Sequence, residues 1–178
     1  MMRTFLTALL LIVLGISGVW AAEPTVMALH DTPRPVPEIA FADKEGRPLT
    51  LKAWQGKIVL LNIWATWCGP CRAEIPTLDR LQAHLGGDRF EVVALSIDRA
   101  GVGVVARFFE EIGTEHLRTF IDDSGKVARD LKVFGLPATL LIGRDGRELG
   151  RLVGPAAWDT PKMIAFLKVV IANQNERN

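Results

Sequence analysis

The sequence predicts an α/β fold in which helices cover a central mixed sheet. Two observations carry this prediction: β-rich apolar runs alternate with segments whose apolar residues repeat at helical spacing, and a strand hairpin followed by one more helix closes the chain. The chain has 178 residues, of which 49% are hydrophobic, so a single domain can bury a core without a disulfide framework. Its 2 cysteines therefore need another explanation.

Residues 1–21 have the three parts of a secretory signal peptide. A positive start that ends at Arg3 is followed by the apolar run Phe5–Trp20 and by small residues up to Ala21. We expect cleavage after Ala21 and export of the remaining chain. The competing interpretation is an uncleaved membrane anchor over residues 5–22, which reach the lower limit of length for a membrane span.

Residues 22–38 predict an extended linker, and the folded domain is expected over residues 39–178. The linker segment is rich in proline and lacks a periodic apolar pattern. At the start of the domain, two short apolar stretches at residues 39–41 and 49–51 flank a polar turn at residues 43–46. This arrangement predicts a small β-hairpin.

Three apolar runs in the middle of the chain predict strands, and the segments between them predict helices. The run Ile58–Ile63 is continuous and β-rich, which is typical of a central strand buried on both faces. A helix is expected from Cys68 to the glycines at Gly86, with a kink at Pro76, because proline removes a backbone donor. The other elements expected here are strands at Glu91–Ile97 and Leu117–Ile121 and helices at Val102–Ile112 and Lys126–Val133.

The pattern changes near the C-terminus. Strands are predicted at Thr139–Ile142 and Glu148–Val153, separated by a turn whose Asp145-Gly146 pair is a strong hairpin signal. An amphipathic helix is expected at Pro161–Ala172. Strands joined through helices, followed by an antiparallel hairpin, together predict parallel and antiparallel pairs in one sheet.

Charge and histidine content argue against two function classes. Lys and Arg number 21 and Asp and Glu number 20, a net charge of +1, which provides no positive field for a nucleic-acid backbone. We therefore expect no nucleic-acid partner. The histidines, His30, His84 and His116, are scattered without ligand spacing, and there is no second pair of cysteines, so we expect no metal site.

Cys68 and Cys71 are separated by two residues at the start of a predicted helix. On the first helical turn this spacing brings the sulfurs close enough to form a disulfide, and a ring so small constrains the unfolded chain little. Redox chemistry is therefore a better explanation than stabilisation. Unpaired backbone donors and the helix dipole favour a thiolate at Cys68, which makes it the attacking sulfur, and Cys71 is expected to be the shielded, resolving thiol.

The stretch Asn62–Pro76 resembles the active-site segment of the thioredoxin superfamily, specifically of the exported TlpA/ResA-like (also CcmG/DsbE-like) thiol-disulfide oxidoreductases. Supporting pieces are Gln55–Lys57, Gly135–Thr139, Gly154 and Trp158. The resemblance covers the chain from about Ile39 to the C-terminus. It implies a thioredoxin fold with an added N-terminal β-hairpin and a central insertion over Arg99–Leu117.

The resemblance also implies roles for individual residues. Cys68 matches the exposed nucleophile of the family and Cys71 its buried partner. Pro137 matches the proline whose preceding peptide bond is cis and which lies against the disulfide, and this arrangement would leave the Leu136 backbone free to pair with an extended substrate. An ordinary proline at the start of a strand is the alternative for Pro137.

Glu74 matches the acidic residue that this subfamily carries three positions after the second cysteine. It shares a helix face with Cys71, so a partly desolvated carboxyl could exchange a proton with the resolving thiol. A solvated helix charge is the alternative. Asn62 stands where cytoplasmic thioredoxins hold a buried aspartate, which shifts proton transfer toward Glu74 or water.

Three residues around the cysteines are expected to contact substrate: Trp67, Gly69 and Pro70. Trp67 would shield the disulfide and offer a contact surface, whereas Trp64 fits core packing equally well. The Gly69-Pro70 pair resembles that of reducing members of the superfamily, although the pair alone does not set the reduction potential.

The resemblance implies a periplasmic reductant of protein disulfides whose only redox group is its own Cys68–Cys71 disulfide, without a cofactor. In the family, electrons come from a membrane thiol transporter, and targets include cysteines of apocytochrome c or of copper-site assembly proteins. One rival is a binding module that holds Cu(I) through two thiolates, although no methionine or histidine stands near the cysteines. A peroxidase, the second rival, would need a different cysteine motif, which is absent.

Overall fold

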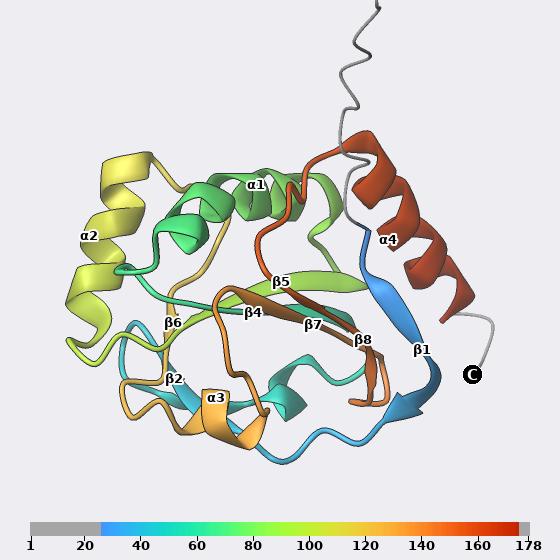
Figure 1. Ribbon diagram of the computed structural model, residues 1–178, viewed down its shortest axis with the longest axis horizontal. Helices are drawn as coiled ribbons and strands as arrows, with labels where there is room; N and C mark the ends of the chain where they lie inside the picture. The colour runs from blue at the N-terminus through green and yellow to red at the C-terminus, as the bar shows by residue number, and fades with distance from the viewer. Residues whose placement is uncertain (1–25, 175–178) are drawn as a thin grey trace, which may run out of the picture.

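Residues 26–174 are described by a computed structural model, in which one 8-stranded mixed sheet is flanked by helices (Figure 1). The strand order is β1-β8-β7-β4-β5-β6-β2-β3. The strands are β1 (Ala28–Arg34), β2 (Ala40–Asp43), β3 (Pro48–Thr50), β4 (Ile58–Trp64), β5 (Phe90–Ser96), β6 (Phe120–Ile121), β7 (Ala138–Ile142) and β8 (Glu148–Val153). The helices are the 3-10 helix η1 (Leu51–Trp54), α1 (Gly69–Leu85), α2 (Val102–Ile112), α3 (Lys126–Asp130) and α4 (Pro161–Asn173). The α/β fold class expected from the sequence is confirmed.

Alternate side chains of β4 pack on opposite faces of the sheet. One face, which we call the α1 face, is covered by α1, α2 and α4, and it buries Ile58, Leu60 and Trp64. The other, the α3 face, is covered by η1 and α3, and it buries Val59, Leu61 and Ile63. Figure 1 shows α1 and α4 on one side of the sheet and α3 on the other. Because both faces are covered, β4 is apolar at almost every position.

The directions of the strands bring two distant segments to one edge of the sheet. β4 runs parallel to β5 and antiparallel to β7, with Ile63 paired to Ala138. The segment that follows β4 therefore lies beside the segment that precedes β7. Cys68 belongs to the first of these segments and Pro137 to the second.

An aromatic cluster fills the α3 face beside the β2–β3 hairpin. Phe41 stacks on Trp54 with ring centroids 5.9 Å apart, and Phe120 meets these two rings edge-on at 5.8 and 5.4 Å. β2 pairs with β3, as the hairpin pattern predicts, and also with β6. The N-terminal hairpin is thereby part of the main sheet, and its aromatic residues join the core.

The prediction of an extended linker over residues 22–38 is wrong for residues 28–34, because these residues form β1 at the edge of the sheet. β1 pairs antiparallel with β8, and the guanidinium of Arg147 donates to the Pro33 carbonyl at 3.2 and 2.7 Å. Proline is compatible with this position because an edge strand needs hydrogen bonds on one side only. The prolines that indicated a linker therefore also fit an edge strand.

Two further elements are shorter than expected. The strand expected at Leu117–Ile121 is reduced to β6, and the backbone N–H of Leu117, at the expected start of the strand, donates to the Asp79 carboxylate at 2.9 Å. The helix expected at Lys126–Val133 ends at Asp130. Lys132 adopts a left-handed backbone with φ of 55°, and the next N–H closes back onto the helix. The helix at Val102–Ile112 is confirmed as α2, and α1 contains Pro76 in its interior.

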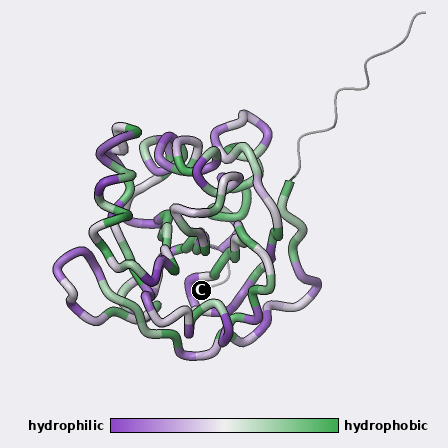
Figure 2. Tube along the Cα trace, turned by 60° about the vertical axis from the view of Figure 1, so that its left-hand side comes forward, coloured by the Kyte–Doolittle hydropathy of each residue, from purple (hydrophilic) through white to green (hydrophobic). Residues whose placement is uncertain are grey.

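Hydropathy follows this arrangement. In Figure 2 the strands that cross the middle of the molecule are mainly hydrophobic and the outer turns mainly hydrophilic. Within residues 26–174, no helix is long and apolar enough to cross a membrane. The predicted signal peptide, residues 1–21, and the alternative anchor, residues 5–22, lie outside the described residues. The expected linker, residues 22–38, is described only from residue 26 onward.

Candidate active site

Cys68 and Cys71 form a disulfide at the N-terminus of α1, with their Cα atoms 5.2 Å apart. Cys68 is the residue that caps the helix: its sulfur accepts the Cys71 backbone N–H at 3.3 Å. Cys68 is 7% exposed and Cys71 1%. The helix terminus supplies N–H groups and a positive dipole end to Cys68, and these favour its thiolate once the disulfide is reduced. Cys68 is also the more accessible sulfur.

A buried carboxylate holds the turn between β4 and Cys68. Asp98 accepts the Thr66 backbone N–H at 2.8 Å, the Thr66 hydroxyl at 2.7 Å and the Ser96 hydroxyl at 2.6 Å. Asp98 follows β5, whose last residue, Ser96, lies beside Trp64. The three hydrogen bonds tie the turn that carries Cys68 to the neighbouring strand. Asp98 is not among the predicted site residues; its one signal in the sequence is a carboxylate close after a central parallel strand.

Pro137 is buried at the start of β7, and the peptide bond before it is cis. Its carbonyl accepts the Gly154 N–H at 2.9 Å, which fixes the loop to the end of β8. Within the described part of the chain, the backbone of Leu136 takes part in no hydrogen bond. A polypeptide that approached Cys68 could therefore pair with Leu136.

The other residues expected to contact substrate lie around the disulfide. Trp67, Gly69 and Pro70 are exposed, and they flank or separate the two cysteines along the chain. Trp64, by contrast, is fully buried and stacks on Phe109 of α2 with ring centroids 5.5 Å apart. Trp64 is thus a core residue, and Trp67 is the tryptophan that a partner can reach.

Glu74 is buried on the α1 face, where three donors surround its carboxylate. It is 3% exposed. One oxygen accepts the Asn62 amide at 2.8 Å and the indole N–H of Trp158 at 2.7 Å, and the other accepts the Ala156 backbone N–H at 3.1 Å. The second hydrogen of the Asn62 amide goes to Thr139 of β7 at 3.0 Å. Asn62 therefore orients Glu74.

Burial raises the pKa of Glu74 to about 7, although the hydrogen bonds from Trp158, Ala156 and Asn62 act in the opposite direction. A carboxyl with such a pKa changes its charge near neutral pH, which suits a group that gives and takes protons at that pH. Glu74 lies three residues after Cys71 on the same helix, so the two side chains share a face. Sequence reasoning found Glu74 but not its partners Trp158 and Ala156, which lie more than 80 positions away.

The three histidines lie in separate places. His30 of β1 is bonded to Glu148 of β8 at 3.0 Å, His84 is in the last turn of α1, and His116 lies 4.0 Å from Glu115. Glu148 also accepts two hydrogen bonds from Arg151. In residues 26–174 no group of three or more His, Cys, Asp or Glu side chains is arranged to hold a metal ion.

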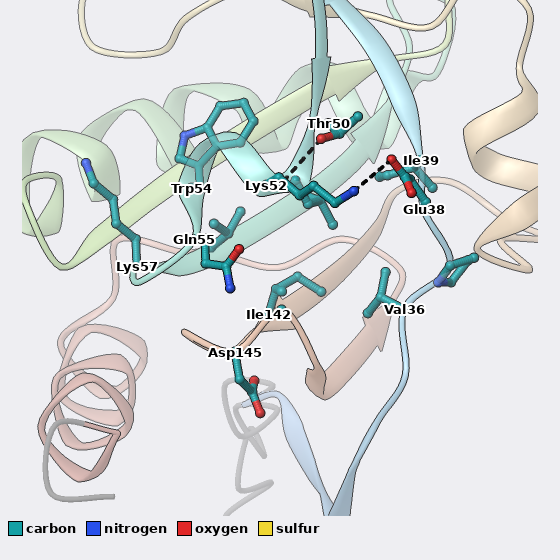
Figure 3. Close-up of a pocket in the computed structure, with 15 residues that line it drawn as sticks. Val36, Glu38, Ile39, Thr50, Lys52, Trp54, Gln55, Lys57, Ile142 and Asp145 are labelled. Atoms are coloured by element: carbon teal, nitrogen blue, oxygen red, sulfur yellow. Dashed lines mark hydrogen bonds and ion pairs between the residues drawn. The ribbon is translucent and has the colours of Figure 1, made fainter. Parts of the chain in front are cut away.

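A cavity of about 310 Å³ opens on the α3 face, away from the disulfide (Figure 3). Its walls include Val59 near the start of β4 and Ile142 at the end of β7, whereas Cys68 follows the end of β4. Among the charged groups that line it, Lys52 pairs with Glu38 at 3.2 Å, and the Asp145 carboxylate accepts the Arg147 backbone N–H. None of the residues predicted for the site lines this cavity.

Comparison with known proteins finds thiol-disulfide oxidoreductases among the relatives of this chain. The AhpC/TSA family matches residues 33–147. The thiol-disulfide oxidoreductase ResA of Geobacillus thermodenitrificans is 33% identical over 148 residues, which cover 82% of this chain and 82% of that protein. The thiol:disulfide interchange protein CycY of Rhizobium leguminosarum is 38% identical over 108 residues, 61% of this chain and 56% of that protein. The crystal structure of a candidate thiol:disulfide interchange protein DsbE from Chlorobium tepidum has 30% identity and a TM-score of 0.66, and the match covers 81% of this chain and 97% of that one.

Proposed function

The chain belongs to the AhpC/TSA family and is a thiol-disulfide oxidoreductase of the thioredoxin fold, and we propose that it reduces the disulfides of protein substrates outside the cytoplasm. The observation that carries the proposal is the Cys68–Cys71 pair at the start of α1, at the same edge of the sheet as Pro137. The disulfide itself is the redox group, and no separate cofactor takes part.

The reaction consists of two thiol-disulfide exchanges. In the reduced protein, the Cys68 thiolate attacks one sulfur of the substrate disulfide; that S–S bond breaks, and the other substrate sulfur leaves as a thiolate and takes up a proton. Cys71 then loses its proton and attacks the Cys68 sulfur, which releases the second substrate thiolate. Two electrons pass to the substrate, and the protein ends with the Cys68–Cys71 disulfide.

Glu74 accepts the proton that Cys71 loses in the second step. Its burial, its position three residues after Cys71 and its pKa of about 7 support this role. Asn62 and Trp158 keep the carboxylate in place. Trp67, Gly69, Pro70, Leu136 and Pro137 form the surface that receives the substrate.

The substrates belong to the cytochrome c maturation or copper-site assembly type, and a membrane thiol transporter re-reduces the protein. The resemblance of Asn62–Pro76 to the TlpA/ResA-like proteins supports both points. The location is periplasmic, directed by residues 1–21. N-terminal sequencing of the periplasmic protein is expected to begin at Ala22, whereas an intact Met1 in the membrane fraction would assign residues 5–22 to an anchor.

The reduction potential of the Cys68–Cys71 pair, measured by equilibration with glutathione, tests the direction of electron flow. A reductant has a potential near that of thioredoxin, about −270 mV, and this is the expected result. A potential near about −120 mV, as in a strong oxidant, would contradict the proposal. Calorimetry of the reduced protein with Cu(I) tests the rival binding module: tight binding by wild type but not by Cys68→Ser would favour that module.

A further inference from the structure

Large hydrophobic side chains are exposed in two regions of the described chain. Trp67, Phe134 and Val153 belong to the edge of the sheet that carries the disulfide. The other two are Leu29 of β1, which is 47% exposed, and Val169 of α4, which is 57% exposed. Because apolar exposure that gathers in one place marks interaction sites, the surroundings of this second pair are informative.

The outer side of α4 differs from that of α2. The exposed residues of α2 include charges of both signs, Arg107, Glu110 and Glu111, as is usual for a helix at the surface. α4 contains no Asp or Glu, and its exposed side chains are small, apolar or positive. Inside the helix these residues are Lys162, Ala165, Lys168, Val169 and Ala172. The outer side of α4 is therefore both apolar and positively charged.

Leu29 lies on the face of the sheet that α4 covers. It pairs with Gly150 of β8, which pairs in turn with Leu141 of β7, and Leu141 belongs to the core of the α1 face. Neighbouring residues on paired strands point to the same side of a sheet. Met27, just before β1, is buried in the same core as Met163 and other residues of α4. Leu29 thus extends the apolar surface of α4 to the edge of the sheet.

Positive charge continues beside α4. Lys168 also lines a hollow of about 510 Å³, together with His84 at the end of α1 and Arg89 before β5. Among the described residues that line this hollow, Asp88 is the one carboxylate. Two permanent cations against one carboxylate favour a negatively charged partner at this side of the molecule.

The predicted membrane segment lies close to this surface along the chain. The apolar run within residues 5–22 belongs to the expected signal peptide or to the alternative anchor, and either would bring the chain to the membrane during export. From residue 22 to Val26, the first described residue, the extended chain spans at most about 14 Å. β1 starts two residues later. Leu29 therefore stays near the membrane while that segment is in it.

We propose that the outer side of α4 and the start of β1 bind the surface of a membrane that contains anionic phospholipids. The surface, which we call the α4 patch, consists of Leu29, Lys162, Ala165, Lys168, Val169 and Ala172. Leu29 and Val169 enter the boundary between headgroups and acyl chains, and the two lysines bind lipid phosphates. The inference goes beyond the redox chemistry and does not depend on it.

This contact leaves the disulfide free. Arg72, next to Cys71 in the first turn of α1, places its guanidinium 4.3 Å above the ring of Phe108 of α2, so the disulfide lies toward α2. Figure 1 shows α2 on the opposite side of the molecule from α4 and β1. A protein bound through the α4 patch is therefore held at the membrane while Cys68 stays open to protein substrates.

Acylation of lysines by a water-soluble reagent tests the proposal. The protein exported by its cell, with its leader cleaved or retained, is combined with vesicles of phosphatidylcholine alone or of phosphatidylcholine mixed with phosphatidylglycerol. Mass spectrometry then measures the rate at each lysine. Acylation of Lys168 is expected to be about fivefold slower with the anionic vesicles, because each lysine that meets an anionic leaflet favours the bound state by about that factor. Lys44, exposed on the β2–β3 turn, should react equally in both.

Three variants make the result specific. Lys168→Glu and Val169→Ser should lose most of the protection of Lys162, whereas Lys44→Glu, which makes the same charge change on the β2–β3 turn, should retain it. All three should reduce oxidised glutathione at the wild-type rate, which shows that they are folded.

Equal acylation of Lys168 with the two kinds of vesicle would overturn the α4 patch. Equal protection of Lys44 and Lys168 would also overturn it, because the attraction would then have no preferred orientation. Protection of Lys168 that grows with protein concentration in the absence of vesicles would assign the patch to a second copy of the chain instead.

Discussion

The two faces of the sheet around β4 are built differently. On the α3 face, Val59, Leu61 and Ile63 belong to an apolar core that contains an aromatic cluster, and Lys52 pairs with Glu38 at the rim of the cavity in Figure 3. On the α1 face, Asn62 is the one polar residue of β4, and its amide donates to the buried carboxylate of Glu74. Burying a carboxyl disfavours its charged form, so ionised Glu74 lowers the free energy of unfolding on the α1 face, whereas the apolar α3 face carries no such cost. The buried polar pair Asn62 and Glu74 lies on the face that carries the disulfide, where a group that titrates can take part in proton transfer.

The largest loss of stability is expected from a substitution on the α3 face. Phe120→Ala removes a ring that is almost fully buried against Phe41 and Trp54, and we expect a loss of about 3–5 kcal/mol in the free energy of unfolding. Urea denaturation measures it, with Phe134→Ala as a matched control that changes stability little. Per folded molecule, the rate of reduction of oxidised glutathione should stay at the wild-type value. A much slower rate would mean that this face also contributes to the chemistry.

Glu74→Gln is expected to change how stability depends on pH. The folded-state pKa of Glu74 is raised from 4.5 to about 7, so the folded protein retains a proton that the unfolded chain has lost. The associated stability is complete below pH 4.5 and is lost as the pH rises to about 7, a decrease of roughly 3 kcal/mol at about 1.36 kcal/mol per unit. The variant lacks this contribution.

Urea-denaturation curves of wild type and Glu74→Gln at pH 4.5 and 7.5 measure the difference. Between these two pH values the stability of wild type should fall by about 3 kcal/mol relative to that of the variant, which does not titrate at this position. The pH profile of disulfide exchange should flatten in the variant. Parallel stability profiles would show that Glu74 ionises with an ordinary pKa in the folded protein. An unchanged exchange profile would remove Glu74 from proton transfer.

A smaller effect is expected from Asp98→Asn. Asparagine has a similar shape, but its amide cannot accept all of the hydrogen bonds from Thr66 and Ser96, so we expect a loss of about 1–3 kcal/mol. Because these bonds hold the turn before Cys68, disulfide exchange should also slow, in contrast to Phe120→Ala. Thr66→Ser, which keeps the hydroxyl, serves as the control. A stability loss without a slower exchange would limit Asp98 to a structural role.

The features that local sequence patterns encode could be predicted. β4 is recognised by a continuous apolar run because it is covered on both faces, and α2 by its apolar spacing. The cysteine pair is indicated by its spacing at the start of a helix, and Pro137 and Glu74 are indicated by the resemblance of their segments to the thioredoxin superfamily. In the structure Cys68 caps α1, Cys71 and Glu74 lie on α1, and Pro137 directly precedes β7.

What the sequence did not reveal depends on contacts between distant residues. The prolines of residues 28–34 indicate a linker but are equally compatible with the edge strand β1, and the Leu117 N–H, at the expected start of the strand that is reduced to β6, donates to Asp79 of α1. Trp158 becomes a partner of Glu74 only when the chain after β8 packs onto α1. Phe134 gives no signal in the sequence, because exposure is a property of the folded loop.

The central claim is that Cys68 attacks and Cys71 resolves, and trapping of a mixed disulfide tests it most directly. Cys68→Ser and Cys71→Ser are each incubated with a disulfide-linked peptide, and the covalent adduct is measured by mass spectrometry. Cys71→Ser should accumulate an adduct on Cys68, whereas Cys68→Ser should form little, because Cys71 is only 1% exposed. Equal amounts of adduct in the two variants would contradict the assignment.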